Sequence, residues 1–285
     1  MPLPANRQNA PSASRAMSVS LLCAIAACSG CAIFSPMPPP LSQAEVLHAL
    51  ETHSGSFRSL VDTDMSLVVT VSADGGRERT PTLTGHIAFD RELPGLWISA
   101  EKVGRQIFSL KARGDSFWLA LPETREVATG SSQAYGKIPY LVRPGEAQRL
   151  LTGIEGLGLR WPGTTMHVED RHYRFDVEVL GGPYAQVLVD RRKLVVSAIR
   201  RYDALGRIVT EVRLDDYRQV GRKLFAHRFS VTRPLSGTEV ALRLGGPKLN
   251  KPIPTEAFQP AERPGWDIID LDRQPLSAVR AFRKE

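Results

Sequence analysis

A period of two dominates the middle of this sequence and constrains its fold more than any other feature. Apolar and polar residues alternate in four clear runs, at residues 83–89, 173–179, 208–214 and 238–244. In the first run Ile87 and Phe89 flank Ala88, and polar His86 precedes them. Such alternation predicts strands with one buried face and one solvated face, which is typical of an antiparallel sheet.

Turn signals between these runs indicate how the strands connect. Short stretches rich in Gly, Asp, Ser or Pro occur at residues 74–76, 114–115, 181–183, 203–206 and 236–237. Such clusters mark hairpin turns. We therefore expect about ten strands between residues 60 and 246. The intervals are too short for the crossover helices of a parallel sheet, so the predicted fold is a mainly β meander.

Two helices are expected beside the strands. Ser42 is a helix N-cap, and Glu45 three residues later completes a capping box, which predicts a helix over residues 42–53. Residues 144–151 begin with Pro, which favours the first turn of a helix, and this second helix would divide the meander in two. Residues 261–285 have the composition of a surface tail.

The N-terminal segment has the pattern of an exported protein. Residues 1–27 contain Arg7 and Arg15 but no acidic residue, and residues 16–27 carry no charge. A basic start followed by a short apolar run is the secretory signal pattern. The run is shorter than the roughly 20 apolar residues that span a bilayer. We therefore expect residues 1–27 to be a signal peptide that is removed.

The end of this segment, Ile25-Ala26-Ala27-Cys28, resembles the lipobox of bacterial lipoproteins. That resemblance implies that the Cys28 thiol receives a diacylglyceryl group and that the chain is cut before Cys28 and acylated there. Cys31 is the alternative, because Ser29-Gly30 also places small residues before it. Ser29, or Ala32 under the second cut, stands where Asp would retain a lipoprotein on the inner membrane. The resemblance thus implies the periplasmic face of the outer membrane in a Gram-negative bacterium.

Composition narrows the classes of partner. All three cysteines precede residue 32, so the remaining chain has no internal disulfide and no cysteine metal site. The formal net charge of +7 falls to +5 once Arg7 and Arg15 are removed. The basic residues are dispersed, which favours attraction to anionic lipid headgroups over nucleic-acid binding. Residues 28–41 include a Pro-rich stretch that predicts an extended linker between the lipid anchor and the domain.

Three local stretches, at residues 108–122, 216–225 and 249–258, resemble segments of the lipoprotein-localisation (LolA/LolB-like) superfamily. The second stretch keeps the turn at Gly221, although Ala226 stands where that superfamily often has Pro. The resemblance covers residues 42–260. It implies an incomplete antiparallel β-barrel, a half-barrel covered by two or so short helices, with an apolar concave face that can hold acyl chains.

The sequence carries no recognisable catalytic constellation. It has no Gly-x-Ser-x-Gly elbow and no His-Glu-x-x-His helix, and its six histidines lack the spacing of metal ligands. We therefore expect a protein that is not an enzyme and that needs no metal or cofactor beyond its covalent lipid.

Core packing is the default role of the apolar residues in the predicted strands, and the alternative is that some of them contact a ligand. The candidates are Ile87, Phe89, Trp97, Phe117, Leu119 and Phe175. The apolar loop at residues 93–97 resembles a loop of the superfamily's outer-membrane receptor. That receptor inserts its exposed hydrophobic loop into the membrane. Two functions follow: a lipoprotein that binds or passes on lipid or lipoprotein acyl chains, or an envelope assembly scaffold with a filled core and protein partners.

Overall fold

The computed structural model of the 285-residue chain describes residues 37–54, 57–73, 76–135, 138, 157–178 and 185–282. The chain divides into two units, Met1–Pro39 and Pro40–Glu285, and the fold below is that of the second. The predicted signal peptide, both candidate lipidation sites and the predicted helix at residues 144–151 lie outside the described residues.

One sheet of sixteen strands forms the described domain. Its N-terminal half contains β1 (Ser59–Ala73), β2 (Gly76–Arg79), β3 (Leu83–Asp90), β4 (Gly95–Lys102), β5 (Arg105–Arg113), β6 (Ser116–Leu121) and β7 (Glu126–Ser131). Its second half contains β8 (Thr165–Val168), β9 (His172–Val177), β10 (Ala185–Asp190), β11 (Val195–Tyr202), β12 (Ile208–Val220), β13 (Lys223–Arg233) and β14 (Thr238–Leu244). Two short strands follow, β15 (Lys248–Leu249) and β16 (Asp267–Asp270).

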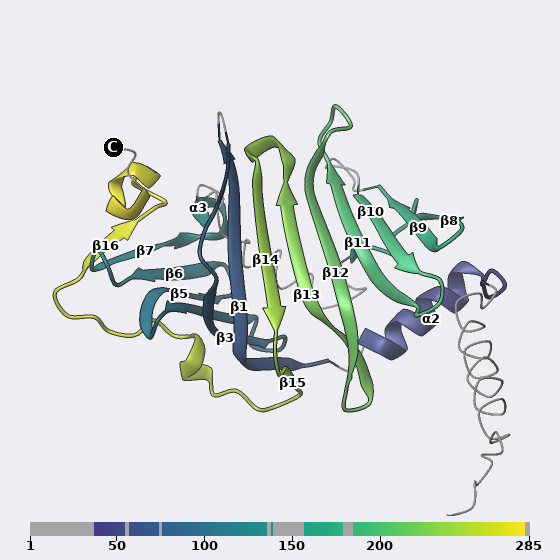
Figure 1. Ribbon diagram of the computed structural model, residues 1–285, viewed down its shortest axis with the longest axis horizontal. Coiled ribbons are helices and arrows are strands. Elements are labelled where there is room, and N and C mark those ends of the chain that lie inside the picture. The colour runs from purple at the N-terminus through teal and green to yellow at the C-terminus, as the bar shows by residue number, and fades with distance from the viewer. Residues whose placement is uncertain are drawn as a thin grey trace, which may run out of the picture. The chain divides into compact units, whose positions relative to one another are not determined.

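The strand order makes the sheet open. It runs β16-β7-β6-β5-β4-β3-β1-β14-β13-β12-β11-β10-β9-β8, with β2 and β15 paired beside β1. Every pairing is antiparallel except that of β16 with β7. In Figure 1 the long central strands β1, β14, β13 and β12 stand upright. Strands β6 and β7 lie to their left and run nearly horizontally. The expected incomplete barrel is thus confirmed: the sheet is strongly twisted, and its two ends, β16 and β8, do not meet.

All four runs of alternating residues form strands, namely β3, β9, β12 and β14. The expected number of strands was too low, because fourteen begin and end between Ser59 and Leu244. Some, such as β2 and β8, have only four residues, too few to show a period. Others are interrupted, as β1 is by a register shift between Asp62 and Met65. Such bulges break the alternation by which a strand is recognised.

The helix α2 (Gln43–Ser54) confirms the one predicted from the capping box. The backbone N–H and the hydroxyl of Ser42 both donate to Glu45 Oε2, each at 2.7 Å. A second, four-residue helix, α3 (Ser132–Tyr135), follows β7. Val46, Leu47 and Leu50 of α2 belong to the hydrophobic core, so α2 buries its apolar side against the sheet.

Side chains that are paired across neighbouring strands share one face, and two apolar rows cross this sheet on the same face. One row runs from β3 to β7 through Ile87, Ile98, Leu110, Leu119 and Ala128. The other runs from β9 to β1 through Phe175, Val187, Ile199, Val212, Val231, Val240 and Val69. Leu67 of β1 joins the halves, because it pairs with Leu83 on one side and Leu242 on the other. We call this side the apolar face.

The opposite face differs between the two halves. Across β8 to β12 it is charged and carries ion pairs, such as Arg200 Nε to Glu211 Oε1 at 3.0 Å and Arg174 to Glu169 at 2.7 Å. Across β4 and β5 it is covered by the chain that follows β15, which includes the 3-10 turn η4 (Thr255–Phe258). Phe258 is fully buried, and its ring lies where a Cβ on Gly95 would come within 2.6 Å. Only glycine allows this approach.

The C-terminal segment is therefore not the surface tail that its composition suggests. Residues of β16 pair with β7, and Leu271 and Val279 beyond it are fully buried. Two 3-10 turns, η5 (Leu276–Ala278) and η6 (Arg280–Phe282), follow. The physical reason is that β7 would otherwise be an open edge strand, with unpaired backbone groups that β16 satisfies.

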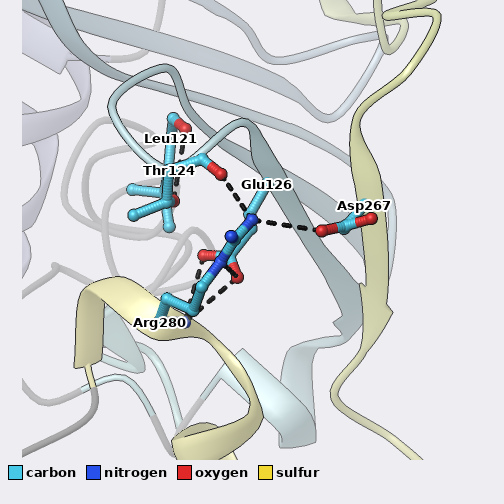
Figure 2. A network of polar contacts seen from close by, with 5 residues as sticks. All are labelled: Leu121, Thr124, Glu126, Asp267 and Arg280. Carbon is cyan, nitrogen blue, oxygen red and sulfur yellow. Dashed lines mark hydrogen bonds and ion pairs between the residues drawn. The ribbon is translucent and has the colours of Figure 1, made fainter.

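A polar clasp holds this segment in place (Figure 2). Glu126, the first residue of β7, is 2% exposed. It accepts hydrogen bonds from the backbone N–H of Arg280 and, at 2.8 Å, from Arg280 Nε. Arg280 also donates to the carbonyl oxygen of Thr124 at 2.6 Å and to Asp267 Oδ2 at 3.1 Å. Burial favours a higher pKa for Glu126, but bonds from Thr124 and Arg280 and the guanidinium charge outweigh it and lower that pKa.

Candidate functional site

The apolar face is the candidate binding surface, and it contains five of the six residues proposed from the sequence. Ile87 and Phe89 lie on β3, Phe117 and Leu119 on β6, and Phe175 on β9. Each of the five is at most 3% exposed, so in this structure all five are packed in the hydrophobic core. Two halves of the sheet that are distant in sequence thus contribute to one surface. That face is continuous and apolar, and its side chains pack together in the core.

Trp97 does not share this surface. It pairs with Ala88 and Lys111, one residue out of phase with Phe89 and Ile98, so its side chain lies on the opposite face. There Trp97 Nε1 donates to Ser109 Oγ at 3.1 Å, and the ring lies edge-on to His86 at 4.2 Å between centroids. Trp97 is large and aromatic like the other candidates, but the pleat of the strand decides which face it occupies.

The loop expected to be apolar and exposed is also different in the structure. Residues 91–94 form the turn between β3 and β4, and Leu96 is fully buried in the core. Trp97 is half-buried by its contacts on the opposite face. The segment 93–97 therefore begins a strand, and it does not present a run of apolar side chains to solvent.

Several residues of the apolar face were not identified from the sequence. Phe57 precedes β1 and packs between Phe89 and Phe225, with ring centroids 5.9 and 5.5 Å apart. Tyr173 is fully buried, and its hydroxyl accepts a hydrogen bond from the backbone N–H of Leu41 at 2.8 Å. Tyr173 was detectable, because it alternates with Phe175 in the predicted strand. Phe57 gave no periodic signal, since it stands outside any strand.

Ionisable groups near the apolar face have structural partners. Burial raises the pKa of Tyr217, whose hydroxyl donates to the carbonyl oxygen of Val196. Asp62 is 1% exposed and accepts from the backbone N–H groups of Asp64 and Gly246. Asp90 accepts in the same way from Glu92 and Leu93. These carboxylates thus hold turns and bulges through hydrogen bonds from the backbone.

Two further features bear on the kind of site. Within the described ranges, His, Cys, Asp and Glu nowhere gather in threes in a way that could hold a metal ion. No helix among the same residues is long and apolar enough to cross a membrane. Cys28 and Cys31 lie outside these residues, so lipidation at either remains a prediction.

The class of protein follows from this architecture: an open, strongly twisted antiparallel sheet with one apolar face, packed against a capped helix. Comparison with models of protein families finds no match, and comparison with curated proteins finds none either. Comparison with solved structures finds similar folds, among them that of a LolA superfamily protein. That part of the sequence-based expectation is confirmed.

Three solved structures illustrate the likeness. A LolA superfamily protein from Nitrosomonas europaea is 12% identical with a TM-score of 0.51, over 78% of this chain and 99% of that one. A putative outer membrane lipoprotein-sorting protein domain from Vibrio parahaemolyticus is 12% identical with a TM-score of 0.54, over 75% and 95%. A DUF1329 family protein from Desulfovibrio piger is 11% identical with a TM-score of 0.55, over 76% and 95%. At these identities the likeness concerns the fold.

Proposed function

We propose that this protein is a non-catalytic lipoprotein, anchored to the periplasmic face of the outer membrane, that binds lipid or lipoprotein acyl chains on its apolar face. One observation carries the proposal: the apolar face is continuous from β7 to β9 in a fold that a lipoprotein-sorting domain shares. The anchor would be the acylated Cys28, with Cys31 as the alternative. Two or more acyl chains hold a protein stably on a membrane.

The driving force for such binding would be burial of methylene groups. Each buried CH₂ contributes about 0.8 kcal/mol, so a chain of a dozen or more carbons binds without any polar contact. The aromatic side chains Phe89, Phe117 and Phe175 are packed in the core, so they would contact a ligand only where it displaces that packing. This requires no metal, cofactor or reacting group.

The ligand can be tested on the compact unit Pro40–Glu285. Native mass spectrometry of this unit, exported and purified without detergent, is expected to show bound lipid. Leu119→Phe, which enlarges a side chain on the apolar face, should reduce the retained lipid. Trp97→Phe is the matched control on the opposite face and should leave the retained lipid unchanged. A unit that carries no lipid and binds no fluorescent fatty acid would instead support the scaffold function.

The anchor is tested separately in the full chain. Cys28→Ser is expected to prevent acylation and to move the protein from the membrane to the soluble fraction. If Cys28→Ser remains acylated while Cys31→Ser does not, the modified residue is Cys31. If a double variant with Cys28→Ser and Cys31→Ser stays in the membrane fraction, lipid anchoring is refuted.

A further inference from the structure

A second surface, on the opposite face of the sheet, has the chemistry of an anion site. Residues 259–263 run alongside β5, from Lys111 to Gln106, and leave a hollow of about 290 Å³ above β5, β6 and β7, counting the part that is open to solvent. Its polar lining consists of Ser109, Lys111 and Arg263. Trp118, Ala120 and Pro260 are among its apolar walls. We call this hollow the strap pocket.

The segment that closes the strap pocket is held at several points. Lys111 Nζ donates to the carbonyl oxygen of Gln259 at 2.8 Å. Arg263 lies over the ring of Trp266, 4.3 Å from its centroid, and donates to Gln106 Oε1 at 3.4 Å. Phe258 is buried against Gly95 just before the pocket. The position of both cations is therefore set by the fold.

The residues that line the strap pocket have more hydrogen-bond donors than their present acceptors use. An ammonium group has three donors and a guanidinium five, so Lys111 and Arg263 keep N–H groups beyond the bonds named above. Ser109 is 7% exposed, and its oxygen already accepts from Trp97 Nε1, which leaves its hydroxyl hydrogen to donate. No carboxylate is among the residues that line the pocket, and the acid next to Arg263 in the chain, Glu262, is exposed.

Electrostatics agree with this geometry. Burial and then the charge of Arg263 lower the pKa of Lys111. Two like charges held in one partly buried hollow repel each other unless an anion lies between them. Phosphate and carboxylate oxygens are the acceptors that arginine and lysine bind most strongly.

We propose that the strap pocket binds an oxyanion, a phosphate or carboxylate group, between Lys111, Arg263 and Ser109, with an apolar part of the same molecule against Trp118. The source of that group is either a phospholipid headgroup or a small soluble organic anion. The strap pocket lies on the face of the sheet opposite to the apolar face. Its occupancy is thus independent of acyl-chain binding, and either proposal can fail alone.

Tryptophan fluorescence provides a direct assay, because Trp97, Trp118 and Trp266 all lie at or beside the cations. Titration of the unit Pro40–Glu285 with inorganic phosphate and with glycerol 3-phosphate should give a saturable change in emission. Lys111→Gln and Arg263→Gln should each weaken binding by about tenfold or more. Lys102→Gln, an exposed lysine at the end of β4, is the matched control and should bind like the parent protein.

Vesicles distinguish the two sources of the anion. Binding to vesicles that contain phosphatidylglycerol, but not to pure phosphatidylcholine, with loss in both pocket variants, assigns a headgroup. Saturable binding of glycerol 3-phosphate without vesicle binding assigns a soluble ligand. The proposal is overturned if the parent protein shows neither response. It is also overturned if folded Lys111→Gln and Arg263→Gln, checked by circular dichroism, bind as well as Lys102→Gln.

Discussion

The clasp between Glu126 and Arg280 should contribute measurably to the stability of the domain. We consider two substitutions, singly and together: Glu126→Gln, which keeps the size of the side chain and removes its charge, and Arg280→Gln, which shortens the side chain and removes the guanidinium charge. If the clasp fastens the C-terminal segment over β7, the effects of the two substitutions on the free energy of unfolding are not additive. Their coupling energy then measures the interaction.

The magnitude follows from burial and geometry. Glu126 is 2% exposed and receives both the backbone N–H and the Nε of Arg280. A hydrogen bond to a charged group contributes about 1.5–3 kcal/mol. The side chain of Arg280 is 52% exposed, so water screens the pair and the lower part of that range applies. We expect each substitution to cost about 1–2 kcal/mol, with a coupling energy of about 1 kcal/mol.

Urea unfolding of the unit Pro40–Glu285, followed by tryptophan fluorescence, measures these energies. Arg273→Gln is the control in the same segment, because Arg273 is 87% exposed and lies 3.4 Å from Asp270. It should change stability by less than about 0.5 kcal/mol. Additive effects of Glu126→Gln and Arg280→Gln, or single losses no larger than that of Arg273→Gln, would refute the reasoning.

The same clasp predicts a pH dependence with a definite sign. The pKa of Glu126 in the fold is lower than its usual value of 4.5. The ionised carboxylate therefore stabilises the folded state fully above pH 4.5, and this contribution is lost as the pH falls through the lowered pKa. The stability difference between the parent protein and Glu126→Gln should accordingly shrink below pH 4.5. A difference that grows on acidification would contradict this assignment.

Three further substitutions test the packing, each by the urea midpoint. Val103 is 97% exposed with φ of 50° in the β4–β5 turn, so Val103→Asn should stabilise by about 0.5–1 kcal/mol; destabilisation would mean that the turn is not strained. Gly95→Ala should cost about 1–3 kcal/mol, because its Cβ would meet the ring of Phe258; a neutral result would show that residues 255–258 do not pack there. Phe89→Ala should cost about 3–5 kcal/mol, because Phe89 is fully buried, and a loss below 1 kcal/mol would place it outside the core.

Several local patterns predicted the structure correctly. Alternation around Ile87 and Phe175 predicted both a strand and the buried face, since in a regular strand the period of two fixes which side chains share a face. Ser42 and Glu45 predicted the start of α2, because a capping box acts within four residues. These are local effects, and local sequence contains them.

The positions of Trp97 and of the C-terminal segment were not predicted correctly from the sequence. Trp97 lies one residue out of phase with Phe89, and a shift of one residue moves a side chain to the other face. Its hydrogen bond to Ser109 and its cation–π contact with Lys111 exist only once β4 and β5 are paired. The pairing of residues 267–270 with β7 joins segments about 140 residues apart, which no local pattern encodes.

The period of two that dominates the sequence by itself determined a mainly β, antiparallel protein with one apolar face. The capping box determined the helix, and the lipobox-like segment predicts an anchor. Only the tertiary structure decided the strand order, the closing of β7 by β16 and the strap pocket between Lys111 and Arg263. The reason is physical: pleat and capping act between near neighbours, whereas edge pairing and the meeting of two cations depend on how distant segments pack.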